Sequence, residues 1–227
     1  MLRSQFEEDL KNLHGKFDQM GQDVNIAISK SVKGFIEHDK SLAKEVIEAD
    51  EKINTQEQEL EKKCFEMIAL QQPVTLDLRN IVTIMKASSD LERMGDHAVS
   101  IAKSTIRVKG NKRVLEIEEE ISDMANHVMN MVSEVLVAYV TTNSEKAIEI
   151  AASDKVTNKY FKSIYRHSIR AMQENPETVV VGADYLQVAG FLERIGDYVT
   201  NICEWIVYLT TGKISELDLK NFEDGEF

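Results

Sequence analysis

The sequence carries one short acidic motif twice. Leu91-Glu92-Arg93-Met94-Gly95-Asp96 recurs as Leu192-Glu193-Arg194-Ile195-Gly196-Asp197, displaced by 101 positions, with five of six residues identical. In each copy a glutamate and an aspartate lie four positions apart, which places both carboxylates on one stripe of a helix. Carboxylates at this spacing can bridge metal ions, and an all-oxygen ligand set favours hard cations such as magnesium, manganese or iron. The motif therefore predicts a duplicated chain with a metal site in each copy.

Further polar residues are expected to face the first motif across a helical hairpin. Asp50 and Asn54 lie on the segment before Pro73, and Pro73 marks the turn. Residues equally distant from the turn face each other in an antiparallel hairpin, so Asp50 should lie opposite Asp96. Asn54 should lie opposite Glu92 for the same reason.

The second copy repeats this arrangement. Asp154 and Asn158 follow Asp50 and Asn54 at a displacement of 104 positions, and the turn of this hairpin lies near Pro176. Asp154 should then lie opposite Asp197, and Asn158 opposite Glu193. Each hairpin is thus predicted to bring three carboxylates and one amide to the same level.

Three acids lie where the helical pattern calls for apolar residues, namely Asp50, Glu57 and Asp154. Burial of an unpaired carboxylate costs several kcal/mol or forces its protonation, so such groups need a cation, a hydrogen-bond network or water. Gly95 and Gly196 add to this pattern, because glycine inside a helix costs about 1 kcal/mol relative to alanine. A backbone or a ligand is expected to come close to both glycines.

The two predicted sites are not equal. Glu57 aligns with Phe161, and His97 aligns with Tyr198, so the second copy lacks one acid and one possible nitrogen ligand. We expect tighter binding or more ions in the first copy. The predicted metal ligands are Asp50, Asn54, Glu57, Glu92, Asp96, Asp154, Asn158, Glu193 and Asp197.

A salt-bridge network is the structural alternative to a metal site. Arg93 and Arg194 adjoin the motif glutamates, and Arg79 could reach other acids. A neighbour in sequence points about 100° away around a helix, however, so Arg93 should not neutralise its own acidic stripe. The metal site is the favoured interpretation, and a purely structural helical scaffold remains open.

A metalloenzyme that uses the carboxylate cluster directly is the other alternative. It would need an open coordination position, a substrate pocket and a base near the metal, and no residue set supplies all three. The sequence also contains no Glu-x-x-His, P-loop, GxGxxG or HExxH pattern. We therefore expect a protein that is not an enzyme.

The composition is that of a soluble globular protein. The 227 residues are 43% hydrophobic and 29% charged, and 39 acids against 27 bases give a net charge of -12, which opposes binding to nucleic acid or anionic membranes. The two cysteines form neither a disulfide framework nor a zinc motif. The N-terminus lacks the apolar region of a signal peptide, and no apolar run reaches 18 residues. A cytoplasmic location is expected.

Apolar residues recur at steps of three and four throughout, which predicts an all-α fold. Six long helices are expected, as two tandem, similar, antiparallel three-helix bundles. Their expected limits are the N-terminus to Glu37, Ser41 as N-cap to Gln72, Thr75 as cap to about residue 108, Ile117 to Ala138, Glu145 to Gln173, and Asn175 as N-cap to Thr211 before Gly212. The predicted units are residues 1–108 and 114–212, followed by an acidic tail at 213–227.

These features resemble the PhoU family of phosphate-uptake regulators. The resemblance extends to about Gly212 and includes both Leu-Glu-Arg-x-Gly-Asp motifs and the segment Leu70-Gln71-Gln72-Pro73-Val74-Thr75-Leu76-Asp77-Leu78-Arg79. It implies a cytosolic, all-helical protein whose Glu/Asp-xxx-Asp motifs carry multinuclear clusters of metals that include iron or zinc. Asn54 and Asn158 depart from the family motif, because each replaces an acid and lowers the charge of its site by one.

The resemblance also implies a role and partners. Members restrain high-affinity phosphate ABC transport and the phosphate-starvation response, and they contact the transporter ATPase and a sensor histidine kinase. We expect an adaptor that associates with the membrane only peripherally through the transporter and forms a homodimer.

Overall fold

The structure is a computed structural model that describes residues 2–108 and 110–217. Within this part of the chain, the regular structure is helical. The helices are α1 (Leu2–Glu37), α2 (Lys40–Gln71), α3 (Leu76–Val108), α4 (Leu115–Val140), α5 (Ser144–Glu174), the short 3-10 helix η1 (Pro176–Thr178) and α6 (Val179–Thr211). The predicted all-α fold with six long helices is confirmed.

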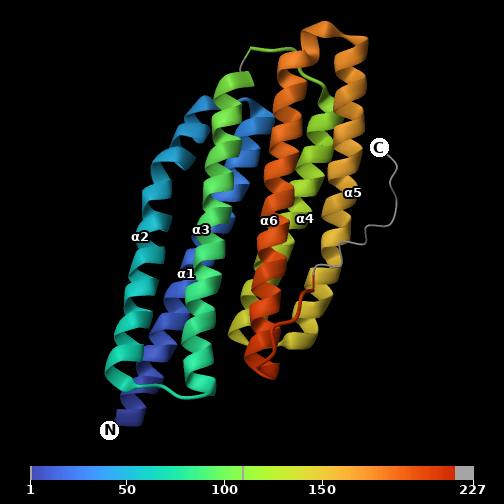
Figure 1. Cartoon of the computed structure of the whole chain (residues 1–227). Helices are drawn as coiled ribbons and strands as arrows, with labels where there is room; N and C mark the ends of the chain where they lie inside the picture. Colours follow the sequence, from blue (N-terminus) through green and yellow to red (C-terminus); the bar gives the residue numbers. More distant parts are fainter. Residues whose placement is uncertain (1, 109, 218–227) are drawn as a thin grey trace.

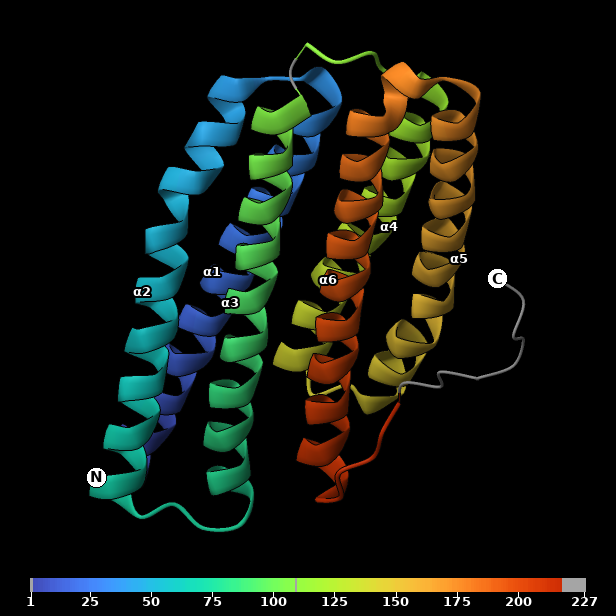
Figure 2. The same cartoon turned by 45° about the horizontal axis from the view of Figure 1, so that its top comes forward.

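The helices form two layers, one packed behind the other (Figures 1 and 2). The order α2, α3, α6, α5 makes up one layer, and α1 and α4 make up the other. Each set of three consecutive helices packs as an antiparallel bundle, and the two bundles meet where α3 contacts α6 and α1 contacts α4. One continuous hydrophobic core includes buried side chains from all six long helices. The limits of the two three-helix repeats, 1–108 and 114–212, stay a prediction.

Local signals at the helix ends explain most of the boundaries. Asp39 is the N-cap of α2, because its carboxylate accepts hydrogen bonds from the backbone N–H groups of Ser41 and Leu42. The prediction that Ser41 is the cap is therefore wrong by two positions. Asn175 caps η1 through the N–H of Glu177, with Pro176 at the first position, as predicted.

The segment after α2 ties the two bundles together at one end. Gln72, in the left-handed conformation with φ 47°, ends α2 directly before Pro73. Arg79 in the first turn of α3 donates to the backbone carbonyl of Leu209, near the end of α6, at 3.4 Å. A cation at a helix C-terminus offsets the partial negative charge of its free carbonyl groups. Arg79 therefore stabilises the end of α6, a role that the sequence did not reveal.

Buried polar contacts connect α3 and α6 further along. Arg107 forms an ion pair with the buried Asp184 and also donates to Gln187 at 2.9 Å. Trp205 donates its indole N–H to the buried carboxylate of Asp90 at 3.3 Å. These contacts hold the two helices antiparallel and at one level.

A second buried network joins the bundles at the opposite end. Glu118 is 1% exposed, and it accepts a hydrogen bond from Tyr185 at 2.8 Å and pairs with Arg113. Nε2 of His38 lies 3.3 Å from Oε1 of Glu118. The Tyr185 hydroxyl in turn accepts from the N–H of Val114 at 3.0 Å. The start of α4, the α1–α2 turn and α6 thus share one network.

We expect Tyr185→Phe to lower the free energy of unfolding by about 2 kcal/mol, because it leaves the Val114 N–H without its partner and removes a donor to buried Glu118. Urea unfolding followed by circular dichroism measures this change. Tyr165→Phe is the control, since Tyr165 is 46% exposed and its substitution should change stability by less than about 0.5 kcal/mol. Equal effects of the two substitutions would contradict the assigned role of the network.

Candidate metal site

The α2–α3 hairpin brings the five predicted ligands of the first unit into one region. Asn54 donates to Asp50 Oδ2 at 3.3 Å within α2. Glu92 of α3 lies close enough to Asp96, Glu57 and Asp50 for their charges to act on it. The register predicted from the turn at Pro73 therefore places these residues together.

Burial and mutual repulsion make this cluster costly to ionise. The partial burial of Asp50 raises its pKa, and the nearby charge of Asp96 raises it further. Burial likewise raises the pKa of Glu92, with Asp96, Glu57 and Asp50 as additional causes. Burial and the charge of Glu61 raise the pKa of Glu57. A cation among these side chains would relieve the repulsion.

Two oxygen atoms in the first cluster are available to such a cation. Asp50 Oδ1 and Asn54 Oδ1 are buried, and neither accepts a hydrogen bond within the described part of the chain. Buried acceptors without a donor are uncommon, because desolvation costs free energy that a hydrogen bond normally offsets. Both are hard oxygen ligands, so the donor set of the first unit fits a hard cation.

The second cluster has the same layout but a different charge balance. Asn158 donates to Asp154 Oδ2 at 2.9 Å, and Asp154 is 7% exposed. Arg194 Nη1 lies 3.3 Å from Asp197 Oδ2, and Arg194 Nε lies 3.9 Å from Glu193 Oε2. The guanidinium group of Arg194, the alternative to a metal ion, therefore contacts both motif acids of the second unit.

In the first unit, Arg93 forms no ion pair with Glu92 or Asp96 among the described residues. Burial raises the pKa of Glu92, and the opposing charge of Arg93 is the smallest of several effects on it. Arg93 points toward α6, and its guanidinium lies 5.9 Å from the ring centre of Tyr198 on that helix. The same group lies 3.7 Å from Asp90 on α3. His97 stacks against Phe191 and Tyr198, with ring centres 5.6 and 5.7 Å apart. The expectation that Arg93 turns away from the acidic stripe is confirmed, and His97 packs against α6 rings.

The two motif glycines make room for the facing helix. A Cβ atom on Gly196 would lie 2.5 Å from Asp154 Oδ1, so any side chain at this position would force Asp154 to move. A Cβ atom on Gly95 would lie 3.3 Å from Ile53 and 3.8 Å from Asp50 Oδ1. The glycines therefore let the aspartate-bearing helices approach, as their cost within a helix suggested.

A pocket of about 160 Å³ lies beside the second cluster. Asp154, Asn158 and Lys155 line it from α5, and Glu216 and Leu217 line it from the segment after α6. Lys155 and Glu216 were not among the predicted site residues. Leu217 has no helical periodicity to reveal its position, so only the three-dimensional structure could identify this contact.

The carboxylates of each cluster lie near one another, but their oxygen atoms do not surround a common point where an ion could bind. Across residues 2–108 and 110–217, no three His, Cys, Asp or Glu side chains form a group that could hold one ion as they stand. Metal binding would therefore require side-chain rotations that draw the acids of a cluster together. The ligand assignment stays a prediction.

Comparison with known proteins identifies the family. Residues 17–105 and 121–206 each match the PhoU domain, so the domain occurs twice, once in each bundle. The chain belongs to the PhoU family. Both matches include the motif acids of their unit, Glu92 and Asp96 in the first and Glu193 and Asp197 in the second.

Full-length relatives and solved structures agree with this membership. The chain is 39% identical over 219 residues to a "phosphate-specific transport system accessory protein PhoU homolog" of Clostridium acetobutylicum, covering 96% of this chain and 100% of that protein. The homologue of that name from Streptococcus pneumoniae is 36% identical over 217 residues, with the same coverage.

Two crystal structures are similar along most of the chain. The phosphate transport system regulatory protein PhoU from S. pneumoniae superposes with a TM-score of 0.87 at 36% identity, covering 92% of this chain and 99% of that one. PhoU from Pseudomonas aeruginosa gives a TM-score of 0.87 at 30% identity, covering 92% of this chain and 100% of that one.

Among the described residues, no helix is long and apolar enough to cross a membrane.

We expect Asp50→Asn to increase the free energy of unfolding of metal-free protein at pH 7, because the amide avoids ionisation of a partly buried group beside Asp96. The folded pKa of Asp50 lies above its unfolded value, so its ionisation costs stability as the pH rises through the folded pKa. The gain from the substitution should therefore shrink between pH 7 and pH 4.

Urea unfolding in the presence of EDTA at the two pH values measures this difference. Glu48→Gln, an exposed substitution on the same helix, is the control and should show no comparable gain. A loss of stability for Asp50→Asn that is larger at pH 7 than at pH 4 would contradict the expected direction.

Proposed function

We propose that this protein is a metal-binding cytoplasmic regulator that restrains high-affinity phosphate uptake and the phosphate-starvation response. The single observation that carries the regulatory role is membership in the PhoU family along nearly the whole chain, with relatives named as accessory or regulatory proteins of phosphate transport. In this proposal it acts as a homodimeric adaptor. It contacts the ATPase of a phosphate ABC transporter, a sensor histidine kinase, or both.

The carboxylate clusters are the proposed metal sites, with the nine ligands predicted from the sequence. Iron, zinc, manganese and magnesium are the candidate ions. The unsatisfied oxygens of Asp50 and Asn54 support the first site, and the raised pKa values of its acids support a cation there. A bound ion would link α2 to α3 and stiffen the face that they share with α5 and α6.

The first site is proposed to bind metal more tightly than the second. Glu57 adds a carboxylate to the first cluster, whereas Phe161 stands at the aligned position in α5. Arg194 already offsets charge on Glu193 and Asp197, although its exposure limits the strength of those pairs. The first cluster therefore has one more acid and no arginine ion pair on its motif acids, although the charges of Lys103 and Arg93 act on Asp50 and Glu92.

Elemental analysis of protein purified without added metal tests the sites. We expect Glu92→Gln/Asp96→Asn to remove most of the bound metal, and Glu193→Gln/Asp197→Asn to remove less. Glu48→Gln/Glu51→Gln, two exposed substitutions on α2, is the control for loss of negative charge and should retain the metal. Circular dichroism verifies that each variant is folded. Equal metal content in all proteins, or a larger loss from the second pair, would refute the assignment.

Deletion of the gene in its native host tests the regulatory role. Without this protein, phosphate-starvation genes should stay expressed in phosphate-rich medium, and expression of the intact chain should restore repression. The metal-site variants, produced at the same level, show whether repression depends on the clusters. Normal repression in the deletion strain would overturn the proposed function without affecting the metal analysis.

A further inference from the structure

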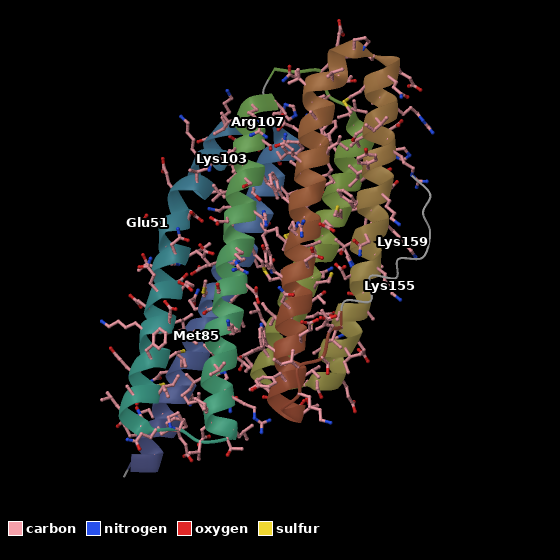
Figure 3. The ribbon with its side chains drawn as sticks, viewed as in Figure 1. Glu51, Met85, Lys103, Arg107, Lys155 and Lys159 are labelled. Atoms are coloured by element: carbon pink, nitrogen blue, oxygen red, sulfur yellow. The ribbon has the colours of Figure 1, made fainter. Side chains whose placement is uncertain are left out.

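A basic face on α5 stands out in an acidic protein. Residues 155–173 contain five lysines and arginines and no aspartate or glutamate, although the whole chain carries a net charge of -12. The five cations are spaced at three or four positions along the helix, so they lie within one stripe about 80° wide. This basic face consists of Lys155, Lys159, Lys162, Arg166 and Arg170. All five are exposed, and Lys155 and Lys159 follow each other along the outside of α5 (Figure 3).

The basic face has no anionic partner within the described structure. Some exposed lysines elsewhere pair with acids, as Lys16 does with Glu59 and Lys146 with Glu134. No described carboxylate lies within ion-pair distance of the five cations. Five like charges on one helix repel one another, so an anionic occupant would be stabilising.

An acidic segment of the chain begins at one end of this face. Residues 218–227 lie outside the described part and contain four acids and one lysine. The residue before them, Leu217, packs against the core, and its N–H donates to Glu204 Oε1 at 2.8 Å. Leu217 and Glu216 line the same pocket as Lys155 and Asn158, so the acidic segment starts beside the first cation of the basic face.

The segment is long enough to reach along the whole face. Residues 155 to 170 span about 22 Å of helix. Ten residues in extended form reach about 33 Å, so the segment from residue 218 can follow the face along its whole length. Because the segment is tethered beside the face, its effective concentration there is on the order of millimolar without any partner.

We propose that the basic face of α5 is a binding surface for an acidic peptide, and that its occupant is the chain's own segment 218–227. Docking also keeps Glu216 and Leu217 over the pocket next to Asp154 and Asn158. An external anionic partner reaches the basic face only by displacing this segment.

Zero-length carbodiimide cross-linking of the full chain tests the proposal, because it joins a lysine amine directly to a touching carboxylate. Mass spectrometry should find links from Lys155, Lys159 or Lys162 to the acids of residues 218–227. The yield should fall by roughly tenfold between low salt and 0.5 M salt, since exposed ion pairs are screened.

Paired charge reversals separate docking from chance contact. Lys159→Glu/Lys162→Glu should abolish the links at Lys155. When the segment acids are also reversed, by Glu223→Lys/Asp224→Lys, cross-links between the segment and α5 should return. Lys44→Glu/Lys62→Glu is the matched control, because both lysines are exposed on α2 and form no described ion pair. This control should leave the links unchanged.

Three results would overturn the proposal. Links from the segment could be spread evenly over exposed lysines, with Lys44 and Lys62 included. In an equal mixture of nitrogen-14 and nitrogen-15 protein, the links could join chains of different isotope, which would make the occupant a second copy. Vesicles of phosphatidylserine could bind the full chain as well as a chain ended after Leu217, which would show that the segment does not occupy the face.

Discussion

The antiparallel packing of α3 against α6 is the contact on which the rest of the structure depends. Asp90 receives the indole N–H of Trp205, Arg107 pairs with Asp184, and Arg79 binds the end of α6. These contacts fix the register of the two helices that carry the acidic motifs. Because α2 and α5 pack on the outer sides of α3 and α6, both carboxylate clusters belong to the same four-helix layer (Figure 1).

The carboxylates within that layer are held at an electrostatic cost. The fold supplies enough apolar burial elsewhere to keep partly buried acids such as Asp50 and Glu92 next to each other. The cost differs between the units, because Arg194 pairs with its motif acids while Arg93 turns toward Asp90 and Tyr198. A duplicated sequence thus produces two sites with different charge, and the difference arises where the two copies pack against each other.

Acidic and basic side chains are unevenly distributed over the helices of this acidic chain. Acids outnumber bases in most helices, whereas five of the six cations of α5 lie on one exposed stripe and the sixth, Lys146, pairs with Glu134. Helical periodicity creates that stripe, and the neighbouring acids of α4 and α6 do not neutralise it within the described part. The overall charge gives only a long-range preference, whereas a partner at close range would meet the charge of a local face.

The sequence by itself determined the six helices, the duplication and the facing of Asp50 and Asp96, because helical period and distance from a turn are local quantities. It could not determine how the two hairpins pack, since that depends on side chains far apart in the chain. The pairing of Arg194, the binding of Arg79 to α6 and the position of Leu217 beside Asp154 follow from this long-range packing. Only the tertiary structure decided them, because similar motifs acquire different neighbours when two copies pack against each other.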